Sequence, residues 1–146
     1  MTAQEKIKFA VVGLGHIGKR HADMIQRHPE TELVAVCDIL PPKESGAEAL
    51  GVPVFSDVDT MLREVPAIEV VNICTPNGLH APFSLKALEA RKHVVCEKPM
   101  ALTKASCEAV LYKALQVHRT VFGVMQNRYS PPSQWIKGLV DQGLLG

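Results

Sequence analysis

Short apolar runs alternate along the chain with segments whose apolar residues recur at helical spacing. The runs are rich in β-branched residues and are typical of strands buried on both faces of a sheet. The alternation predicts an α/β fold, a doubly wound parallel sheet with helices on both faces and right-handed crossovers. Strands are expected over residues 7–12, 32–37, 52–55, 68–74, 93–96 and 120–124, and helices over residues 16–28, 43–50, 58–65, 80–90, 103–118 and 131–146.

A Gly-x-Gly-x-x-Gly sequence joins the first expected strand to the first helix. Its glycines are Gly13, Gly15 and Gly18, and His16 and Ile17 lie between the last two. Gly13 permits a tight turn, Gly15 lets the backbone approach a pyrophosphate, and Gly18 allows close packing of helix on strand. The N-terminus of the helix offers free N–H groups to the phosphates. Because such glycine turns also occur by chance, the loop needs a second signal.

That second signal is Asp38, which ends the second expected strand about 20 residues after Gly18. An acidic residue at this place is expected to accept a hydrogen bond from an adenosine ribose. A carboxylate also repels a 2′-phosphate, and only Lys43 follows as a nearby cation. The sequence therefore predicts a dinucleotide site that takes NAD in preference to NADP.

Two further polar segments follow strands, at the edge of the sheet where ligands of such folds bind. Thr75, Pro76 and Asn77 follow the fourth strand; they are interpreted as a wall against the nicotinamide half of the cofactor, and ordinary turn chemistry is the alternative. His80 begins the next helix on the same side. A contact from His80 to cofactor or substrate and a purely structural role are equally compatible with its position.

The second informative motif is Glu97-Lys98-Pro99, directly after the fifth strand. An unpaired buried charge is destabilising, so a charged pair in a crevice is expected to have a ligand. Glu97 is a candidate for the ribose hydroxyls near the nicotinamide. Lys98 is a candidate for proton transfer with a substrate hydroxyl and is also counted with the cofactor-binding residues. The alternative is an exposed salt bridge in a loop.

Two histidines near the glycine loop are ambiguous. His16 is counted with the cofactor-binding residues because it lies inside the loop, although a solvent-facing position is the alternative. His21 follows Lys19 and Arg20 on the first helix and is expected on a solvated face.

Composition narrows the class of protein further. A chain of 146 residues is one domain by length, and its net charge of +1 with scattered basic residues shows neither a nucleic-acid footprint nor a membrane-surface patch. No leader peptide or membrane-length apolar run is visible, so a cytoplasmic protein is expected. The cysteines show no C-x-x-C pair and no zinc spacing, so buried reduced thiols and no metal are expected at Cys37, Cys74, Cys96 and Cys107.

The segments GLGHIG, Asp38, CTPNGLH and VVCEKPMA, in this order and at these separations, resemble the glucose-fructose oxidoreductase, inositol dehydrogenase and MocA family of NAD(P)-dependent oxidoreductases. The resemblance implies a Rossmann nucleotide domain followed by an α/β domain that holds the substrate and makes subunit contacts, so that full-length members form homo-oligomers. This second domain is absent from the chain. Lys98 matches the catalytic lysine of the family, and its cofactor positions are matched by Gly13, Gly15, Gly18 and Asp38.

The resemblance also suggests a division of the chain. Residues 1–125 are expected to form the NAD-binding domain, and residues 126–146 a junction loop and helix leading toward the missing domain, with an apolar side at Trp135, Ile136, Leu139 and Val140. Residues 126–129 are similar to members that act on nucleotide-linked amino sugars, or are a polar junction loop. The expected function is hydride transfer between nicotinamide and a hydroxyl-bearing carbon of a sugar, nucleotide sugar or cyclitol. A non-catalytic dinucleotide-binding module is the alternative.

Overall fold

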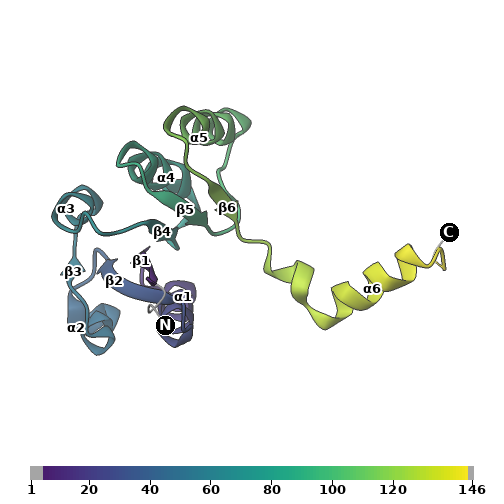
Figure 1. The fold of residues 1–146 in the computed structure, drawn as a ribbon, viewed down its shortest axis with the longest axis horizontal. Coiled ribbons are helices and arrows are strands. Elements are labelled where there is room, and N and C mark those ends of the chain that lie inside the picture. The colour runs from purple at the N-terminus through teal and green to yellow at the C-terminus, as the bar shows by residue number, and fades with distance from the viewer. Residues whose placement is uncertain (1–4, 145–146) are drawn as a thin grey trace.

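The computed structural model describes residues 5–144, and its centre is a six-stranded sheet in the order β3-β2-β1-β4-β5-β6 (Figure 1). All neighbouring strands are parallel, as the sequence predicts for uninterrupted apolar runs. Because the strands are parallel, the chain segments that follow them lie along one edge of the sheet. The strands are β1 (Ile7–Val12), β2 (Thr31–Cys37), β3 (Val54–Phe55), β4 (Val70–Ile73), β5 (His93–Cys96) and β6 (Val121–Gly123).

Helices connect the strands and cover both faces of the sheet. Figure 1 shows α4 and α5 on one side of the strands and α1 on the other. The helices are α1 (His16–Arg27), α2 (Pro42–Ser45), α3 (Val58–Glu64), α4 (His80–Glu89), α5 (Lys104–Val117) and α6 (Pro131–Asp141), with short 3-10 turns η1 (Ala47–Leu50), η2 (Asn77–Leu79) and η3 (Gln126–Tyr129). The doubly wound parallel fold expected from the alternation is confirmed.

The apolar core is split by the sheet into two clusters. Alternate residues of β1 belong to different clusters: Val12 packs with α3, α4 and α5, whereas Val11 packs with α1. Strand side chains alternate between the faces with a period of two, so one apolar run supplies both layers. The larger cluster is centred on fully buried Met61 and Leu88. The sheet is thereby fixed on both faces, which holds its carboxyl edge in place.

The segment between β2 and β3 differs from the single helix expected over residues 43–50. Gly46 has a φ of 75° and ends α2 in the left-handed conformation, and the chain continues as η1. Glycine adopts this conformation without the Cβ penalty and commonly ends helices. The strand that follows is also shorter than expected, because only Val54 and Phe55 pair with β2.

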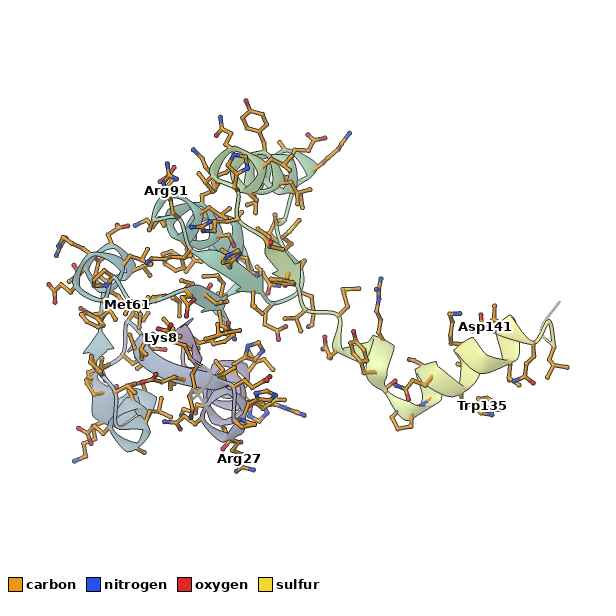
Figure 2. The ribbon with its side chains drawn as sticks, in the orientation of Figure 1. Lys8, Arg27, Met61, Arg91, Trp135 and Asp141 are labelled. Atoms are coloured by element: carbon orange, nitrogen blue, oxygen red, sulfur yellow. The ribbon has the colours of Figure 1, made fainter. Side chains whose placement is uncertain are left out.

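The last described helix, α6, extends away from the sheet (Figure 1). Its expected apolar side is found in solvent: Trp135 is 67% exposed, and Ile136 and Val140 are also exposed. Figure 2 places Trp135 and Asp141 on this projecting helix, far from Met61 in the body of the domain. The helix ends at Asp141 and residues 142–144 form a turn, so it is shorter than the helix expected over residues 131–146, of which residues 145 and 146 lie outside the described residues. Between residues 5 and 144 no helix is long and apolar enough to cross a membrane.

The cysteines follow the expectation of buried, unpaired thiols at three of four positions. Cys37, Cys74 and Cys96 are buried and free, whereas Cys107 is partly exposed. Burial raises the pKa of Cys37 and of Cys74 to about 12. In the part of the chain that the structure describes, no group of three or more His, Cys, Asp or Glu side chains is placed to hold a metal ion.

This arrangement predicts that Cys107 alone reacts rapidly with an aromatic disulfide reagent at pH 8. The other thiols are inaccessible and little ionised, and the thiolate is the reactive form. Titration of the native chain should release close to one equivalent of chromophore, against four in denaturant. The Cys107→Ser variant is the control, and it should show no rapid phase. Rapid release of two or more equivalents from the native chain would contradict the buried positions.

Candidate functional site

The glycine loop between β1 and α1 is built so that two of its glycines cannot carry a side chain. Gly13 has a φ of 87°, and a Cβ there would lie 2.8 Å from the carbonyl oxygen of Cys74. A Cβ on Gly18 would lie 1.8 Å from the carbonyl oxygen of Gly13. Because neither glycine carries a side chain, the loop lies directly against the end of β4 and α1 lies directly against the loop. The roles expected for Gly13 and Gly18, a tight turn and close helix packing, agree with this geometry.

The third glycine faces open space. A Cβ on Gly15 would meet no protein atom within 4 Å. Gly15 is also the N-cap of α1, and no side chain caps the helix and no acidic residue lies in its first turn. The N–H groups of this turn are therefore available to an anion, and the positive end of the helix dipole favours one. The cradle fits the pyrophosphate of a dinucleotide.

His16 and Ile17 occupy the first turn of α1. His16 is exposed, as its alternative interpretation has it, and remains a predicted cofactor residue only by position. Ile17 is half-buried and packs against the smaller core cluster beside Ala22. Ile17 therefore has a packing role, which is compatible with the cradle.

Asp38 lies at the end of β2 and holds the glycine loop directly. The N–H of Leu14 donates to its Oδ2 at 2.6 Å, and the N–H of Leu40 donates to its Oδ1 at 2.8 Å. Each carboxylate oxygen has a second lone pair, so the group can still accept hydroxyl hydrogens. Asp38 thus does more than sequence reasoning assigned to it: besides lying where a ribose is expected, it fixes the position of the loop.

The segment after β4 adjoins the glycine loop. A Cβ on Gly13 would lie 2.8 Å from the Cys74 carbonyl oxygen and 3.0 Å from the Thr75 nitrogen. Thr75 is half-buried, whereas Pro76 and Asn77 are exposed at the start of η2. The Thr75 Oγ1 atom is buried, and within residues 5–144 it has no hydrogen-bond partner. The segment therefore borders the cradle, as expected for a wall of the cofactor site.

The His80 side chain contacts two backbone carbonyl groups, which is the structural role that the sequence left open beside a ligand contact. Its side chain is 1% exposed; Nδ1 lies 2.7 Å from the Pro99 carbonyl oxygen, and Nε2 lies 2.7 Å from the Thr75 carbonyl oxygen. A neutral imidazole donates to one of these carbonyls and an imidazolium donates to both. The ring thus connects the loop after β4 to the loop after β5.

Glu97 and His21 meet inside the domain, which sequence reasoning missed. Glu97 is 6% exposed, and its Oε1 lies 3.1 Å from His21 Nε2, while Asn72 Nδ2 lies 2.9 Å from His21 Nδ1. The expectation that His21 faces solvent is wrong. No local pattern signals this contact, because its partners are 76 and 51 residues from His21 in the sequence.

Lys98 is exposed beside this buried group. It lines a cavity of about 220 Å³ together with Met125, Gln126, Asn127 and Arg128. Lys98 takes part in no ion pair among residues 5–144, so its ammonium group is available at the strand edge. The structure thus brings Lys98 together with residues 126–128 of the 126–129 segment, for which the sequence left a substrate contact and a polar junction loop equally open.

A larger cavity of about 590 Å³ lies on the α1 side of the sheet. Its walls include Arg20 and Met24 of α1, Val95 of β5 and Tyr129 of η3, and the buried group of His21, Asn72 and Glu97 also faces it. Its lining is mostly apolar. Ile17 at the start of α1 and Glu97 before Lys98 also line this cavity.

A parallel sheet with this cradle, Asp38 and a free lysine at its carboxyl edge defines a nicotinamide-dinucleotide-binding domain of an oxidoreductase. The comparison with known families agrees. The family described as "Oxidoreductase family, NAD-binding Rossmann fold" matches residues 7–124, and the chain belongs to this family. The resemblance noted in the sequence, and the Rossmann fold that it implied, are thereby confirmed.

Curated relatives cover almost the whole chain. It is 34% identical over 145 residues to the inositol 2-dehydrogenase of Rubrobacter xylanophilus, and 34% identical over 143 residues to the D-glucoside 3-dehydrogenase of Escherichia coli. These matches span 97% and 96% of this chain but only 42% and 40% of the two relatives. The chain thus corresponds to less than half the length of the enzymes it matches.

Solved structures agree at the level of the fold. The scyllo-inositol dehydrogenase of Lactobacillus casei with bound NAD(H) and scyllo-inositol has a TM-score of 0.87 at 34% identity, covering 97% of this chain and 43% of that one. The WlbA dehydrogenase of Bordetella pertussis in complex with NADH and UDP-GlcNAcA has a TM-score of 0.88 at 34% identity, covering 95% and 43%.

Proposed function

We propose that this chain is the NAD-binding domain of a dehydrogenase that oxidises a hydroxyl-bearing carbon of a cyclitol, a sugar or a nucleotide sugar. The observation that carries the proposal is the free ammonium group of Lys98 at the same sheet edge as the phosphate cradle. The substrate class is supported by the relatives, which are named as inositol and glucoside dehydrogenases, and by the complex with UDP-GlcNAcA.

Each part of the site has a separate task in this proposal. The first turn of α1 and Gly15 hold the pyrophosphate, and Asp38 accepts hydrogen bonds from the adenosine ribose. The segment Thr75–Asn77 borders the nicotinamide half. Bound NAD supplies the hydride acceptor, so the protein contributes binding, orientation and electrostatics. Lys98 exchanges a proton with the reacting hydroxyl, either directly or as a relay.

The surroundings of the domain follow from the same proposal. Residues 126–146 lead toward the substrate-holding domain that the family resemblance implies, and the exposed apolar side of α6 belongs to that junction. The three buried free thiols support a reducing, cytoplasmic location. Assembly as a homo-oligomer is proposed from the family resemblance alone.

The cofactor part of the proposal predicts that the chain binds NAD more tightly than NADP, and that Asp38→Asn narrows this preference. The variant loses the charge that repels a 2′-phosphate, and its amide oxygen can accept only one of the two loop N–H groups that the carboxylate accepts. A hydrogen bond to a charged group contributes about 1.5–3 kcal/mol, so NAD affinity should fall about tenfold or more. Calorimetric titration of both cofactors measures the effect.

Asp59→Asn is the matched control for Asp38→Asn, because Asp59 is an exposed carboxylate on α3 that pairs with Lys86. The control should bind both cofactors as the unaltered chain does. Tighter binding of NADP than NAD by the unaltered chain would reject the assignment of Asp38 as the ribose ligand.

A further inference from the structure

A continuous chain of hydrogen bonds runs from β4 through α1 to the Lys98 loop. Asn72 Nδ2 lies 2.9 Å from His21 Nδ1, and His21 Nε2 lies 3.1 Å from Glu97 Oε1. The second carboxylate oxygen of Glu97, Oε2, accepts the backbone N–H of Lys98 at 3.2 Å. The side chains of His21 and Glu97 are 14% and 8% exposed. These hydrogen bonds are therefore largely shielded from water, which strengthens each of them.

The direction of these bonds follows from the groups involved. The carboxylate of Glu97 only accepts, so His21 Nε2 carries the hydrogen that it receives. The Asn72 amide nitrogen only donates, so Nδ1 of the same ring accepts. A neutral imidazole protonated on Nε2 satisfies both bonds at once. His21 thus has one tautomer in which the chain of hydrogen bonds is complete.

We propose that His21 is a positioning residue, which orients the Glu97 carboxylate so that Glu97 holds the backbone of Lys98. The proposal rests on the function proposed above for Lys98. It links the helix whose first turn forms the phosphate cradle to the residue assigned to proton transfer. It also gives Glu97 a role other than the ribose contact expected from the sequence, since each of its oxygens already has a partner.

Stability alone does not account for this arrangement. Burying a carboxylate carries a desolvation penalty, and apolar residues of similar volume are often as stabilising as a buried charged group. The group also borders the cavity of about 590 Å³, and Asn72 Oδ1 has no partner in the described part of the chain. A core selected only for stability would avoid the unpaired oxygen. What the group does provide is a fixed position for the Lys98 amide.

The test uses amide hydrogen exchange of Lys98, read by NMR on this chain without cofactor. His21→Leu removes both hydrogen bonds of the ring, so exchange at the Lys98 amide should accelerate about tenfold or more. His21→Gln returns a side-chain N–H to the carboxylate and should recover most of this protection. Met24→Ala is the matched control, because Met24 lines the same cavity from α1 but is 61% exposed and outside the chain of bonds.

Unchanged exchange in His21→Leu, or equal acceleration in Met24→Ala, would overturn the proposal. If His21→Leu fails to fold, imidazole nitrogen shifts of the unaltered chain decide instead: hydrogen on Nε2 alone supports the proposal, and hydrogen on Nδ1 overturns it. In the dehydrogenase that contains this domain, His21→Leu should lower kcat with KM for NAD unchanged, and His21→Gln should restore kcat. Accelerated exchange with unchanged turnover in both His21→Leu and Lys98→Ala would reject the function assigned to Lys98 and leave the hydrogen-bond chain intact.

Discussion

Gly18→Ala is expected to unfold the chain, whereas Gly15→Ala is expected to fold and to lose its cofactor. The Cβ of an alanine at Gly18 would lie 1.8 Å from a backbone oxygen of the same rigid turn. Relief requires α1 to move away from the sheet, which opens the smaller core cluster around Ala22 and Ile25. We expect a loss of more than about 4 kcal/mol, which is comparable to the whole stability of many domains.

Gly15→Ala isolates the ligand contact from the folding effect. Its φ of −63° suits alanine, and the added Cβ meets no protein atom within 4 Å. Alanine is a poorer N-cap than glycine, so stability should fall by about 1 kcal/mol or less. The methyl group occupies the space into which a pyrophosphate would fit, so NAD affinity should fall at least about tenfold.

Urea unfolding and calorimetric titration with NAD measure the two effects separately. The pair is informative because both variants add the same methyl group to the same loop. Full NAD affinity in Gly15→Ala would show that the pyrophosphate does not lie over this turn. A Gly18→Ala variant as stable as the unaltered chain would contradict the packing of α1 against the glycine loop.

The sheet could be predicted because each central strand is marked locally. The runs that form β1, β4 and β5 are mostly apolar, with Lys8, Asn72 and His93 as their polar residues, and a strand covered on both faces makes such a run favourable. The glycine loop was equally accessible, because each of its glycines serves a backbone requirement that no other residue meets as well. Family membership followed from the same motifs in their order along the chain.

Other features depend on contacts that the local sequence does not encode. The break of the expected 43–50 helix at Gly46 could have been found, since glycine inside a helical pattern lowers helix stability. The contact between His21 and Glu97 could not have been found, because neighbouring Lys19 and Arg20 are typical of a solvated face. The His21 side chain is 14% exposed, and Glu97, which directly follows β5, lies 3.1 Å from it. Long-range polar pairs of this kind carry no periodicity.

The sequence predicted where the residues of the candidate site lie better than it predicted what each of them contacts. Gly15, Asp38 and Lys98 lie at the expected edge of the sheet, each with a group free to meet a ligand. For Glu97 the sequence indicated a ligand contact, because a charged residue after a buried strand needs a partner, and for His80 it left a ligand contact and a structural role equally open. The structure supplies those partners from within the chain, through backbone carbonyls and through His21.

In the dehydrogenase proposed above, Lys98→Ala is expected to lower kcat by about 10²–10⁴-fold, the usual contribution of a general acid or base. Its amine is free, exposed and next to the 126–128 segment, so it can reach a substrate without disturbing the cradle. NAD affinity should therefore stay nearly unchanged. In the pH profile of kcat, the limb that reports this group should disappear. Steady-state kinetics and calorimetry measure the two quantities.

Lys104→Ala provides the matched control for Lys98→Ala. Lys104 is an exposed lysine at the start of α5 whose one ion pair among residues 5–144 is with Glu108 on the same helix, and its loss should leave both kcat and NAD affinity unchanged. The opposite pattern for Lys98→Ala, with weakened NAD binding and full turnover at saturating cofactor, would make Lys98 a cofactor ligand. The proton would then have to be taken by a group outside this domain, because the carboxylate of Glu97 is buried and already holds His21 and the Lys98 amide.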